Sequence, residues 1–176
     1  KKVAVGKEGW LYLGDKYNTG LSRGRDMVSV SDKEIEDWII SMKGVKSWLE
    51  SQGIPLIIAI APNKHSVYPE YLPEWAEISH PNSTDRLVSE AKKEHLKILD
   101  MRAELIERKK NHDYLFSKTD SHWTMLGAYF GYKMIMEELS SQVEGVTFVG
   151  FEDLEAKKIT RAACCMAGML KIAGRL

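Results

Sequence analysis

Asp120 and His122 are the two residues whose types and spacing best suit a catalytic role. They stand in the run TDSHWT at residues 119–124. A carboxylate two positions before a histidine can hold the imidazole in one tautomer and orientation, and such an imidazole can take a proton from a serine. The pair comes just before an amphipathic stretch, at a loop-to-helix junction, where catalytic side chains are often placed. We interpret Asp120 and His122 as two members of a Ser-His-Asp acyl-transfer site.

Two other interpretations of these residues stay open. Asp120 could cap the following helix while His122 packs nearby, which is the commoner role of an isolated Asp-x-His pair. A metal site would draw on His112, Asp113, Asp120 and His122. Zinc sites favour regular ligand spacing, which this group lacks, so we expect neither a metal nor a cofactor.

The sequence shows no evident nucleophile. Ser66, Ser117 and Ser121 are weak candidates, because the chain contains neither a Gly-x-Ser-x-Gly nor a Gly-Asp-Ser motif. Ser121 lies between the acid and the base and would point away from both in an extended loop. We therefore expect this chain to supply the acid and the base of the site without its serine.

Lys64, Tyr68 and Trp123 are the candidate substrate-binding residues. Lys64 and Tyr68 lie in a long, proline-rich segment at 62–73 that follows an apolar run, and open α/β sheets bind ligands where their strands end. Lys64 could hold an anionic sugar or help assemble the site, and a solvated loop cation is at least as good an interpretation. Several aromatic residues could form a sugar-stacking platform, although core or loop anchors are the commoner role: Trp10, Tyr12, Tyr68, Tyr71 and Trp75.

Composition narrows the class of protein. The chain has 176 residues, of which 44% are hydrophobic and 28% charged, and this size suits one domain over 1–176. Lys and Arg number 25, as do Asp and Glu, so no basic excess points to nucleic acid or to an anionic membrane. The longest apolar run, 54–61, is far shorter than the roughly 20 residues that cross a bilayer.

The order of predicted elements indicates an α/β fold. Two short apolar runs around a Gly-Lys-Glu-Gly turn predict a hairpin over 3–13, and Ser31 with Glu34 forms a capping box for a helix that ends at Gly53. The continuous apolar run at 55–61 predicts a central strand covered on both faces. Further elements are expected at 83 or 85 to 94 (helix), 96–99 (strand), 101–110 (helix), 113–116 (strand or bend), 125–139 (helix), 146–149 (strand) and 151–173 (helix).

Four segments of the chain, in this order, resemble the SGNH-hydrolase-like domain of alginate O-acetylation proteins of the AlgX/AlgJ type. They are KEGWLYL at 7–13, PNK at 62–64 with YPEYLP at 68–73, TDSHWT at 119–124 followed by Gly127-Ala128, and AGML at 167–170. The last resembles the Gly-Asp-Leu element of the family without its aspartate. Each segment is weak evidence alone, and their order makes the match more specific.

The resemblance implies a flavodoxin-like or SGNH-type three-layer sandwich with a mostly parallel sheet. In this family Asp-x-His precedes the serine, so the chain would be the N-terminal part of such a domain, ending before the nucleophile. The implied function is O-acetyl transfer to an exported polysaccharide or cell-wall glycan outside the cytoplasm. The acetyl donor would come from a partner such as a membrane-bound acyltransferase. The alternatives are a carbohydrate acetylesterase and a non-catalytic carbohydrate-binding or assembly module of an export complex.

Overall fold

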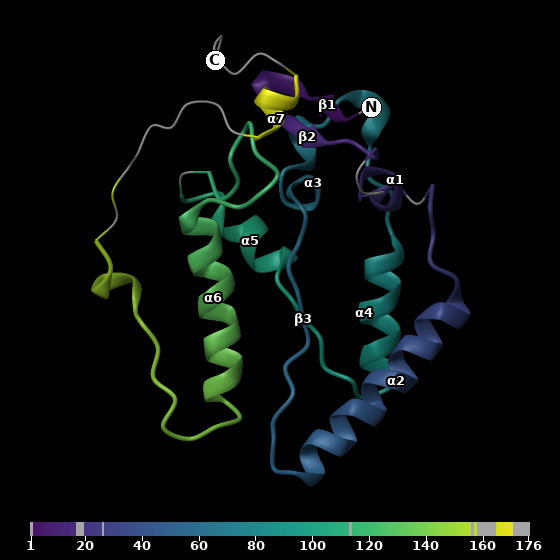
Figure 1. The fold of residues 1–176 in the computed structure, drawn as a ribbon, viewed down its shortest axis with the longest axis vertical. Helices are drawn as coiled ribbons and strands as arrows, with labels where there is room; N and C mark the ends of the chain where they lie inside the picture. Colours follow the sequence, from purple (N-terminus) through teal and green to yellow (C-terminus); the bar gives the residue numbers. More distant parts are fainter. Residues whose placement is uncertain are drawn as a thin grey trace.

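The computed structural model describes residues 2–16, 20–25, 27–112, 114–155, 157 and 165–170. Figure 1 shows short strands between larger helices. The helices are α1 (Gly20–Gly24), α2 (Asp32–Ser51), α3 (Lys64–Val67), α4 (Ser83–Lys93), α5 (Arg102–Arg108), α6 (Met125–Ser140) and α7 (Cys165–Met169). The strands are β1 (Val3–Val5), β2 (Leu11–Leu13), β3 (Ala59–Ile60) and β4 (Leu99–Asp100), and the short 3-10 turns are Lys7–Gly9, Pro69–Tyr71, Glu74–Ala76 and Phe151–Asp153.

The N-terminal hairpin is confirmed. β1 and β2 pair antiparallel, with Val3 opposite Leu13 and Val5 opposite Leu11. The connecting turn places Gly9 at a φ of 79°, a backbone conformation that glycine adopts without steric cost. The hairpin brings Leu11 to the part of the molecule that holds the Asp120–His122 loop, as described below.

Helix α2 begins at the predicted capping box. The Ser31 hydroxyl accepts the Glu34 N–H, and the Glu34 carboxylate accepts the Ser31 N–H at 2.8 Å. Gly53, at a φ of 71°, follows the helix as expected. For α4 the cap is Asn82 rather than Ser83 or Asp85: its side chain accepts the N–H groups of Thr84 and Asp85, while Asp85 reaches back to the Asn82 N–H.

The predicted central strand is shorter and more exposed than its sequence suggested. β3 contains two residues and pairs in parallel with β4, and none of residues 54–60 is buried. The prediction that 55–61 is covered on both faces is therefore wrong for this chain. In the described residues β3 has a neighbour on one side only, so its other edge and part of its surface stay open.

Helix α6 is confirmed, and its glycines have a specific packing role. We expected Gly127 and Gly131 to allow close approach to a sheet. A Cβ atom at Gly127 would lie 2.2 Å from the carbonyl oxygen of Leu115, and one at Gly131 would lie 2.9 Å from ring atoms of Trp123. The glycines therefore admit the segment that carries Asp120 and His122, and not a sheet.

The C-terminal third departs from prediction at two places. Residues 146–149 form no strand ladder and are mostly exposed. The helix expected over 151–173 is confirmed only at Cys165–Met169, and Phe151–Asp153 is a 3-10 turn. The rest of that prediction falls largely on 158–164 and 171–173, outside the described residues, as does Asp113 at the start of the predicted 113–116 element.

β3 runs between α6 on one side and the α2–α4 pair on the other (Figure 1). α2 and α4 pack through a cluster built on Ile35, Ile39, Ala91 and Leu96, and α7 packs on the hairpin through Met166 and Ala167. The main core lies around the upper end of β3 in Figure 1 and is rich in aromatic residues. It includes Trp10, Tyr12, Tyr68, Leu105, Leu115, Phe116 and Phe130.

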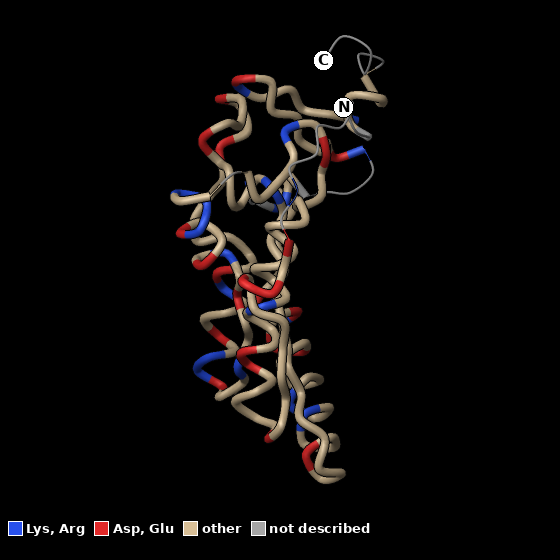
Figure 2. The backbone as a smooth tube through the Cα atoms, turned by 90° about the vertical axis from the view of Figure 1, so that its left-hand side faces the viewer, with Lys and Arg blue, Asp and Glu red and all other residues tan. Residues whose placement is uncertain are grey.

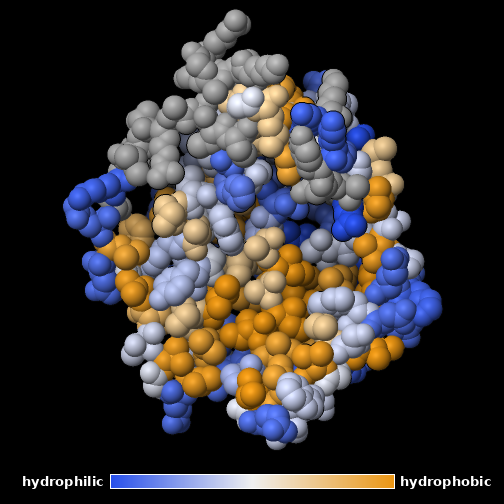
Figure 3. All heavy atoms as spheres, in the orientation of Figure 1, coloured by the Kyte–Doolittle hydropathy of each residue, from blue (hydrophilic) through white to orange (hydrophobic). Residues whose placement is uncertain are grey.

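Charged residues of both signs are spread along the backbone (Figure 2). One face shows an apolar area over its lower half, bordered by hydrophilic residues (Figure 3). Among the described helices, none combines the length and the apolar character that a membrane span requires.

Candidate active site

The loop that carries Asp120 and His122 is closed at both ends by backbone contacts. Phe116 and Trp123 form an isolated antiparallel bridge, and the Thr124 N–H donates to the carbonyl of Leu115 at 2.8 Å. Thr124 is also the N-cap of α6, since its hydroxyl accepts the Gly127 N–H. Thr124 therefore occupies the capping role that was the alternative for Asp120.

Asp120 and His122 contact each other directly. Asp120 Oδ1 lies 2.7 Å from His122 Nδ1 and also accepts the backbone N–H of His122 at 3.1 Å. An ionised carboxylate accepts hydrogen bonds only, so this contact assigns the proton of a neutral imidazole to Nδ1 and leaves the lone pair on Nε2. This is the tautomer in which a histidine can serve as a general base through Nε2.

Exposure differs sharply between the two side chains. The His122 side chain is 79% exposed, whereas that of Asp120 is 19% exposed. A surface pair of this kind adds little to stability, because solvent screens its attraction. The contact is better suited to orienting an accessible imidazole than to holding the fold together.

Lys64 lies beneath the same loop. It is 4% exposed, and its ammonium group donates to the carbonyls of Ser117 at 2.9 Å, Lys118 at 3.2 Å and Asp120 at 2.7 Å. The rings of Trp10 and Tyr12 flank the ammonium, with centroids 5.4 and 5.1 Å away. Lys64 follows β3 as the first residue of α3, so the parallel strand pair fixes where its side chain starts.

Two further elements hold carbonyls of this loop. The Leu11 N–H of β2 donates to the carbonyl of Lys118 at 2.8 Å, and the Met166 N–H of α7 donates to the carbonyl of Thr119 at 3.2 Å. Segments from both ends of the chain therefore meet at the loop. Its backbone between 117 and 120 is held by β2, α3 and α7 together.

Tyr68 and Trp123 are packed rather than presented to solvent. Tyr68 is buried, and its hydroxyl accepts the Leu115 N–H at 3.0 Å. Trp123 packs against the main core, stacks on Phe116 at a centroid distance of 6.3 Å, and covers Gly131. Contact of these two residues with substrate stays a prediction.

The aromatic residues considered as a sugar platform are mainly core. Trp10 is fully buried and stacks on Tyr68 and Tyr71 at 4.5 and 4.6 Å, and Tyr12 is buried with its hydroxyl bonded to the carbonyl of Tyr68. Trp75 differs, since it is exposed, with the guanidinium of Arg25 5.7 Å from its ring centroid.

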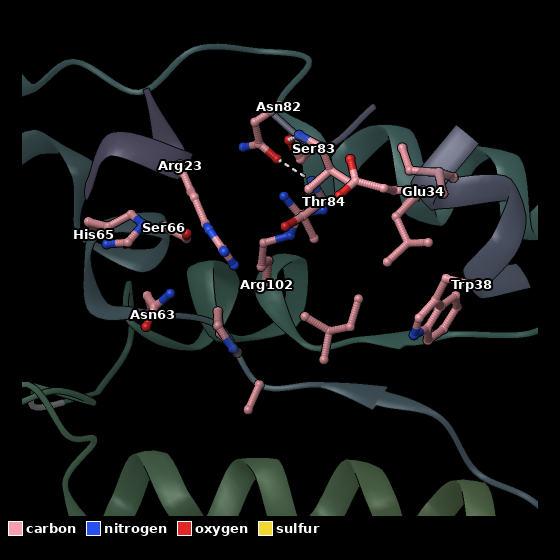
Figure 4. Close-up of a pocket in the computed structure, with 16 residues that line it drawn as sticks. Arg23, Glu34, Trp38, Asn63, His65, Ser66, Asn82, Ser83, Thr84 and Arg102 are labelled. Atoms are coloured by element: carbon pink, nitrogen blue, oxygen red, sulfur yellow. Dashed lines mark hydrogen bonds between the residues drawn. The ribbon is translucent and has the colours of Figure 1, made fainter. Parts of the chain in front are cut away.

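A hollow of about 860 Å³ opens where β3 ends. Figure 4 shows Asn63, His65 and Ser66, from the segment after β3, on one side of it and Glu34 and Trp38 of α2 on the other. Arg23, Arg102 and the start of α4 lie between them. Arg102 is held by Asp100 and Asp85. Burial lowers the pKa of His65 to about 4, an effect that the negative charge of Asp15 only partly offsets.

The described residues do not bring a serine to His122. The hydrogen bonds given by the backbone N–H and by Nδ1 of His122 both go to Asp120, and in this part of the chain none joins His122 to a serine hydroxyl. Ser66 lines the hollow of Figure 4 instead. His112 packs against Phe130 with its ring tilted by 52° at a centroid distance of 5.0 Å. Among the described residues no three His, Cys, Asp or Glu side chains gather as metal ligands would.

Sequence reasoning identified the pair and missed how it is held. The acceptors of Lys64 are main-chain carbonyls, which every residue carries, so no residue type marked them in advance. The sequence signal that pointed to Lys64 was its position shortly after the strand predicted at 55–61.

Comparison with known proteins matches residues 3–165 to the family described as "SGNH hydrolase-like domain, acetyltransferase AlgX". Two similar relatives are each named "Probable alginate O-acetylase AlgJ". That of Pseudomonas fluorescens is 28% identical over 80% of this chain and 34% of its own length. That of Pseudomonas syringae pv. tomato is 30% identical over 72% of this chain and 30% of its own. The chain thus spans about a third of the length of the curated relatives it matches.

Two solved structures share the fold. The O-acetyltransferase domain of Pseudomonas putida AlgJ superposes with a TM-score of 0.59 at 23% identity, over 80% of this chain and 48% of that one. Bacillus cereus PatB1 with a sulfonyl adduct gives a TM-score of 0.52 at 18% identity, over 81% of this chain and 45% of that one. These likenesses confirm an α/β fold of the SGNH-like kind. The mostly parallel three-layer sandwich stays an expectation for a whole domain, since the described residues contain two small two-stranded sheets.

Proposed function

Because the chain belongs to the AlgX family of SGNH hydrolase-like domains, we propose that it supplies the acid and the base of a Ser-His-Asp site that O-acetylates an exported polysaccharide. The observation that carries the proposal is the 2.7 Å contact between Asp120 Oδ1 and His122 Nδ1. The serine comes from polypeptide outside the part described here. The relatives are about three times longer than the matched region, which leaves room for such a segment.

The reaction proceeds in two acyl transfers. His122 Nε2 takes the serine proton while the serine oxygen attacks the carbonyl carbon of the acetyl donor. Asp120 holds the Nδ1–H and stabilises the imidazolium that forms. As the tetrahedral intermediate collapses, the imidazolium returns the proton to the leaving group, and an acetyl-serine remains.

In the second step a sugar hydroxyl attacks the acetyl-serine. His122 Nε2 takes the hydroxyl proton and delivers it to the departing serine oxygen, so the enzyme is regenerated and the sugar carries the acetyl ester. The high exposure of His122 suits a polymeric acceptor, which must reach the base from solvent. With water as the acceptor, the same residues would make the protein a carbohydrate acetylesterase.

The cellular location and the partners that we propose follow from the proposed substrate. The matched relatives are named for O-acetylation of alginate, and we extend to this chain a polysaccharide substrate and a site of action outside the cytoplasm, in the periplasm or at the cell surface. The acetyl donor would be delivered by a partner, such as a membrane-bound acyltransferase. No step of the proposal uses nucleic acid, a metal or a cofactor.

Variants of the protein that contains this chain test the proposal. We expect His122→Ala to abolish acetyl transfer to polysaccharide, and Asp120→Asn to lower it by about 10²- to 10⁴-fold, because the amide favours the wrong tautomer. The matched control is His80→Gln. His80 Nδ1 lies 2.8 Å from Asp85 Oδ2, a similar pair in a different place, and its loss should leave transfer unchanged. Full activity of His122→Ala would refute the proposal.

One observation favours a second candidate, a non-catalytic carbohydrate-binding or assembly module. In the described residues no serine is bonded to His122. This candidate predicts polysaccharide binding that survives His122→Ala and is lost on truncation of an exposed aromatic residue such as Trp75. Acetyl release that depends on His122 would exclude it, and equal release with and without added glycan would favour the esterase.

A further inference from the structure

Lys64 is a buried cation whose placement needs an explanation. Removing an ammonium group from water is costly unless hydrogen bonds and opposing charge replace its hydration. Here three carbonyls replace it, and the faces of Trp10 and Tyr12 add cation–π attraction. A hydrophobic side chain would fill this space without that cost, so packing alone does not account for a lysine.

The three carbonyls belong to one short stretch of backbone. Ser117, Lys118 and Asp120 lie within four positions, and their oxygens converge on a single nitrogen at 2.7–3.2 Å. An ammonium group has three N–H donors, enough to serve all three of these carbonyls. The loop must curve around Lys64 for all three distances to be satisfied together, so the cation fixes the loop's shape.

Asp120 links this cation to the proposed base. Its carbonyl faces Lys64 at 2.7 Å, while its carboxylate holds both the N–H and Nδ1 of His122. We infer that Lys64 is a positioning residue, whose buried ammonium fixes the 117–120 backbone so that the Asp120 carboxylate meets Nδ1 of His122. This role replaces the sugar contact suggested by the position of Lys64 in the sequence.

The consequence for catalysis rests on the proposed function, but the geometry can be tested without it. Long-range ¹H–¹⁵N correlation spectra of the His122 side chain at neutral pH distinguish the Nδ1–H from the Nε2–H tautomer. The spectra are recorded on the protein that contains this chain. We expect the native protein to show mainly the Nδ1–H form, and Lys64→Met to lose that preference while circular dichroism and the melting transition show a folded protein.

Lys118→Met is the matched control. Lys118 lies on the same loop and also gives its carbonyl to Lys64, but its own amine lies beside the ring of Tyr114 and 3.4 Å from the carbonyl of Glu8. Its loss removes a positive charge from the loop without removing the ammonium beneath it. We expect the His122 tautomer to be unchanged in Lys118→Met.

An unchanged tautomer in folded Lys64→Met would overturn the inference. Lys64→Gln, which keeps N–H donors on a shorter arm, takes its place if the methionine variant does not fold. Failure of both variants to fold would make Lys64 a core residue and also overturn it.

In the protein that contains this chain, Lys64→Met should lower kcat and leave the KM for glycan unchanged. A raised KM with an unchanged tautomer would return Lys64 to substrate binding. A changed tautomer together with full activity of His122→Ala would leave the positioning role intact and refute the proposed function alone.

Discussion

At the scale of single residues, the histidines of this chain differ mainly in what surrounds them. His122 is exposed and held by one carboxylate, whereas His65 is 8% exposed and lines the hollow after β3. Burial disfavours the charged form of an imidazole, which lowers the pKa of His65. The two residues therefore suit different roles, one as an accessible base and the other as a neutral part of the wall.

His65 should make the fold sensitive to acid. Its pKa falls from 6.5 to about 4 on folding, so between these values the unfolded chain binds more protons than the folded one. The free energy of unfolding must then fall as pH is lowered from about 6.5 to 4, by roughly 3 kcal/mol in total. Urea denaturation at several pH values measures this slope, and His65→Gln should flatten it.

The control for this prediction is His95→Asn. His95 is exposed at a φ of 56°, a backbone conformation that asparagine tolerates. This variant should keep the native pH slope. An equally steep slope in His65→Gln would show that other groups are responsible.

Residue-scale prediction succeeded where the contact is local. Asp120 and His122 are two positions apart, so their spacing alone made contact feasible. Lys64 is 56 residues from Asp120 in sequence, and its acceptors are backbone atoms. Only the folded arrangement of β2, β3 and α7 reveals that contact.

At the scale of elements, α6 and the 115–124 segment pack as one unit. Gly127 of α6 lies against the carbonyl of Leu115, and Gly131 lies under Trp123. Helix propensity disfavours glycine by about 1 kcal/mol relative to alanine, so these positions are held by close packing. Any shift between helix and segment would move Asp120 and His122.

Gly127→Ala should therefore destabilise the protein. The added methyl group would lie 2.2 Å from a backbone oxygen, which cannot rotate away as a side chain could. We expect a loss of about 1–3 kcal/mol, typical of overpacking, despite the gain in helix propensity. Chemical denaturation checks both the sign and the size.

Gly44→Ala is the control, and we expect it to stabilise a helix rather than destabilise it. Gly44 lies within α2 and a Cβ atom there would contact nothing within 4 Å. Alanine should stabilise this helix by about 1 kcal/mol. If both variants were stabilising, the close approach of α6 to Leu115 would be wrong.

Elements with their own local signals were predictable from sequence. The capping box at Ser31, the stop at Gly53 and the turn between β1 and β2 each lie within a few residues of the element they define. β3 was predicted in place but not in extent, because strand length and burial depend on neighbouring strands. The helix expected over 151–173 had favourable residue types but no clear start signal.

At the scale of the whole molecule, two features leave the fold incompletely covered: the open edge of β3 and the apolar area of the face shown in Figure 3. A hollow of about 240 Å³ lies beside the β3–β4 pair and is lined partly by Leu56, Ile57 and Ile58, which precede β3, and by Leu96, Lys97 and Leu99 of the β4 segment. Exposed strand edges and apolar areas of this kind are usually covered in soluble proteins. The matched AlgJ domain is about twice as long as the aligned part of this chain, and we predict that additional polypeptide covers this edge in a longer protein.

Ile57 and Ile58 can test whether such a cover exists in the longer protein. Adjacent residues of an extended segment point to opposite faces, and Ile58 packs against the α2–α4 cluster. Ile58→Glu should destabilise this chain and the protein that contains it alike. Ile57→Glu should change the free energy of unfolding of this chain by about 1 kcal/mol or less, since the side chain is half-exposed here.

In the longer protein we expect the cost of Ile57→Glu to rise to about 2–4 kcal/mol, because the glutamate would be buried between β3 and its cover. Hydrogen exchange offers a second readout, since a strand laid along the open edge would protect the amides of 56–60 more than they are protected in this chain. An equally small effect of Ile57→Glu in both proteins, with unchanged exchange, would mean that this face stays open.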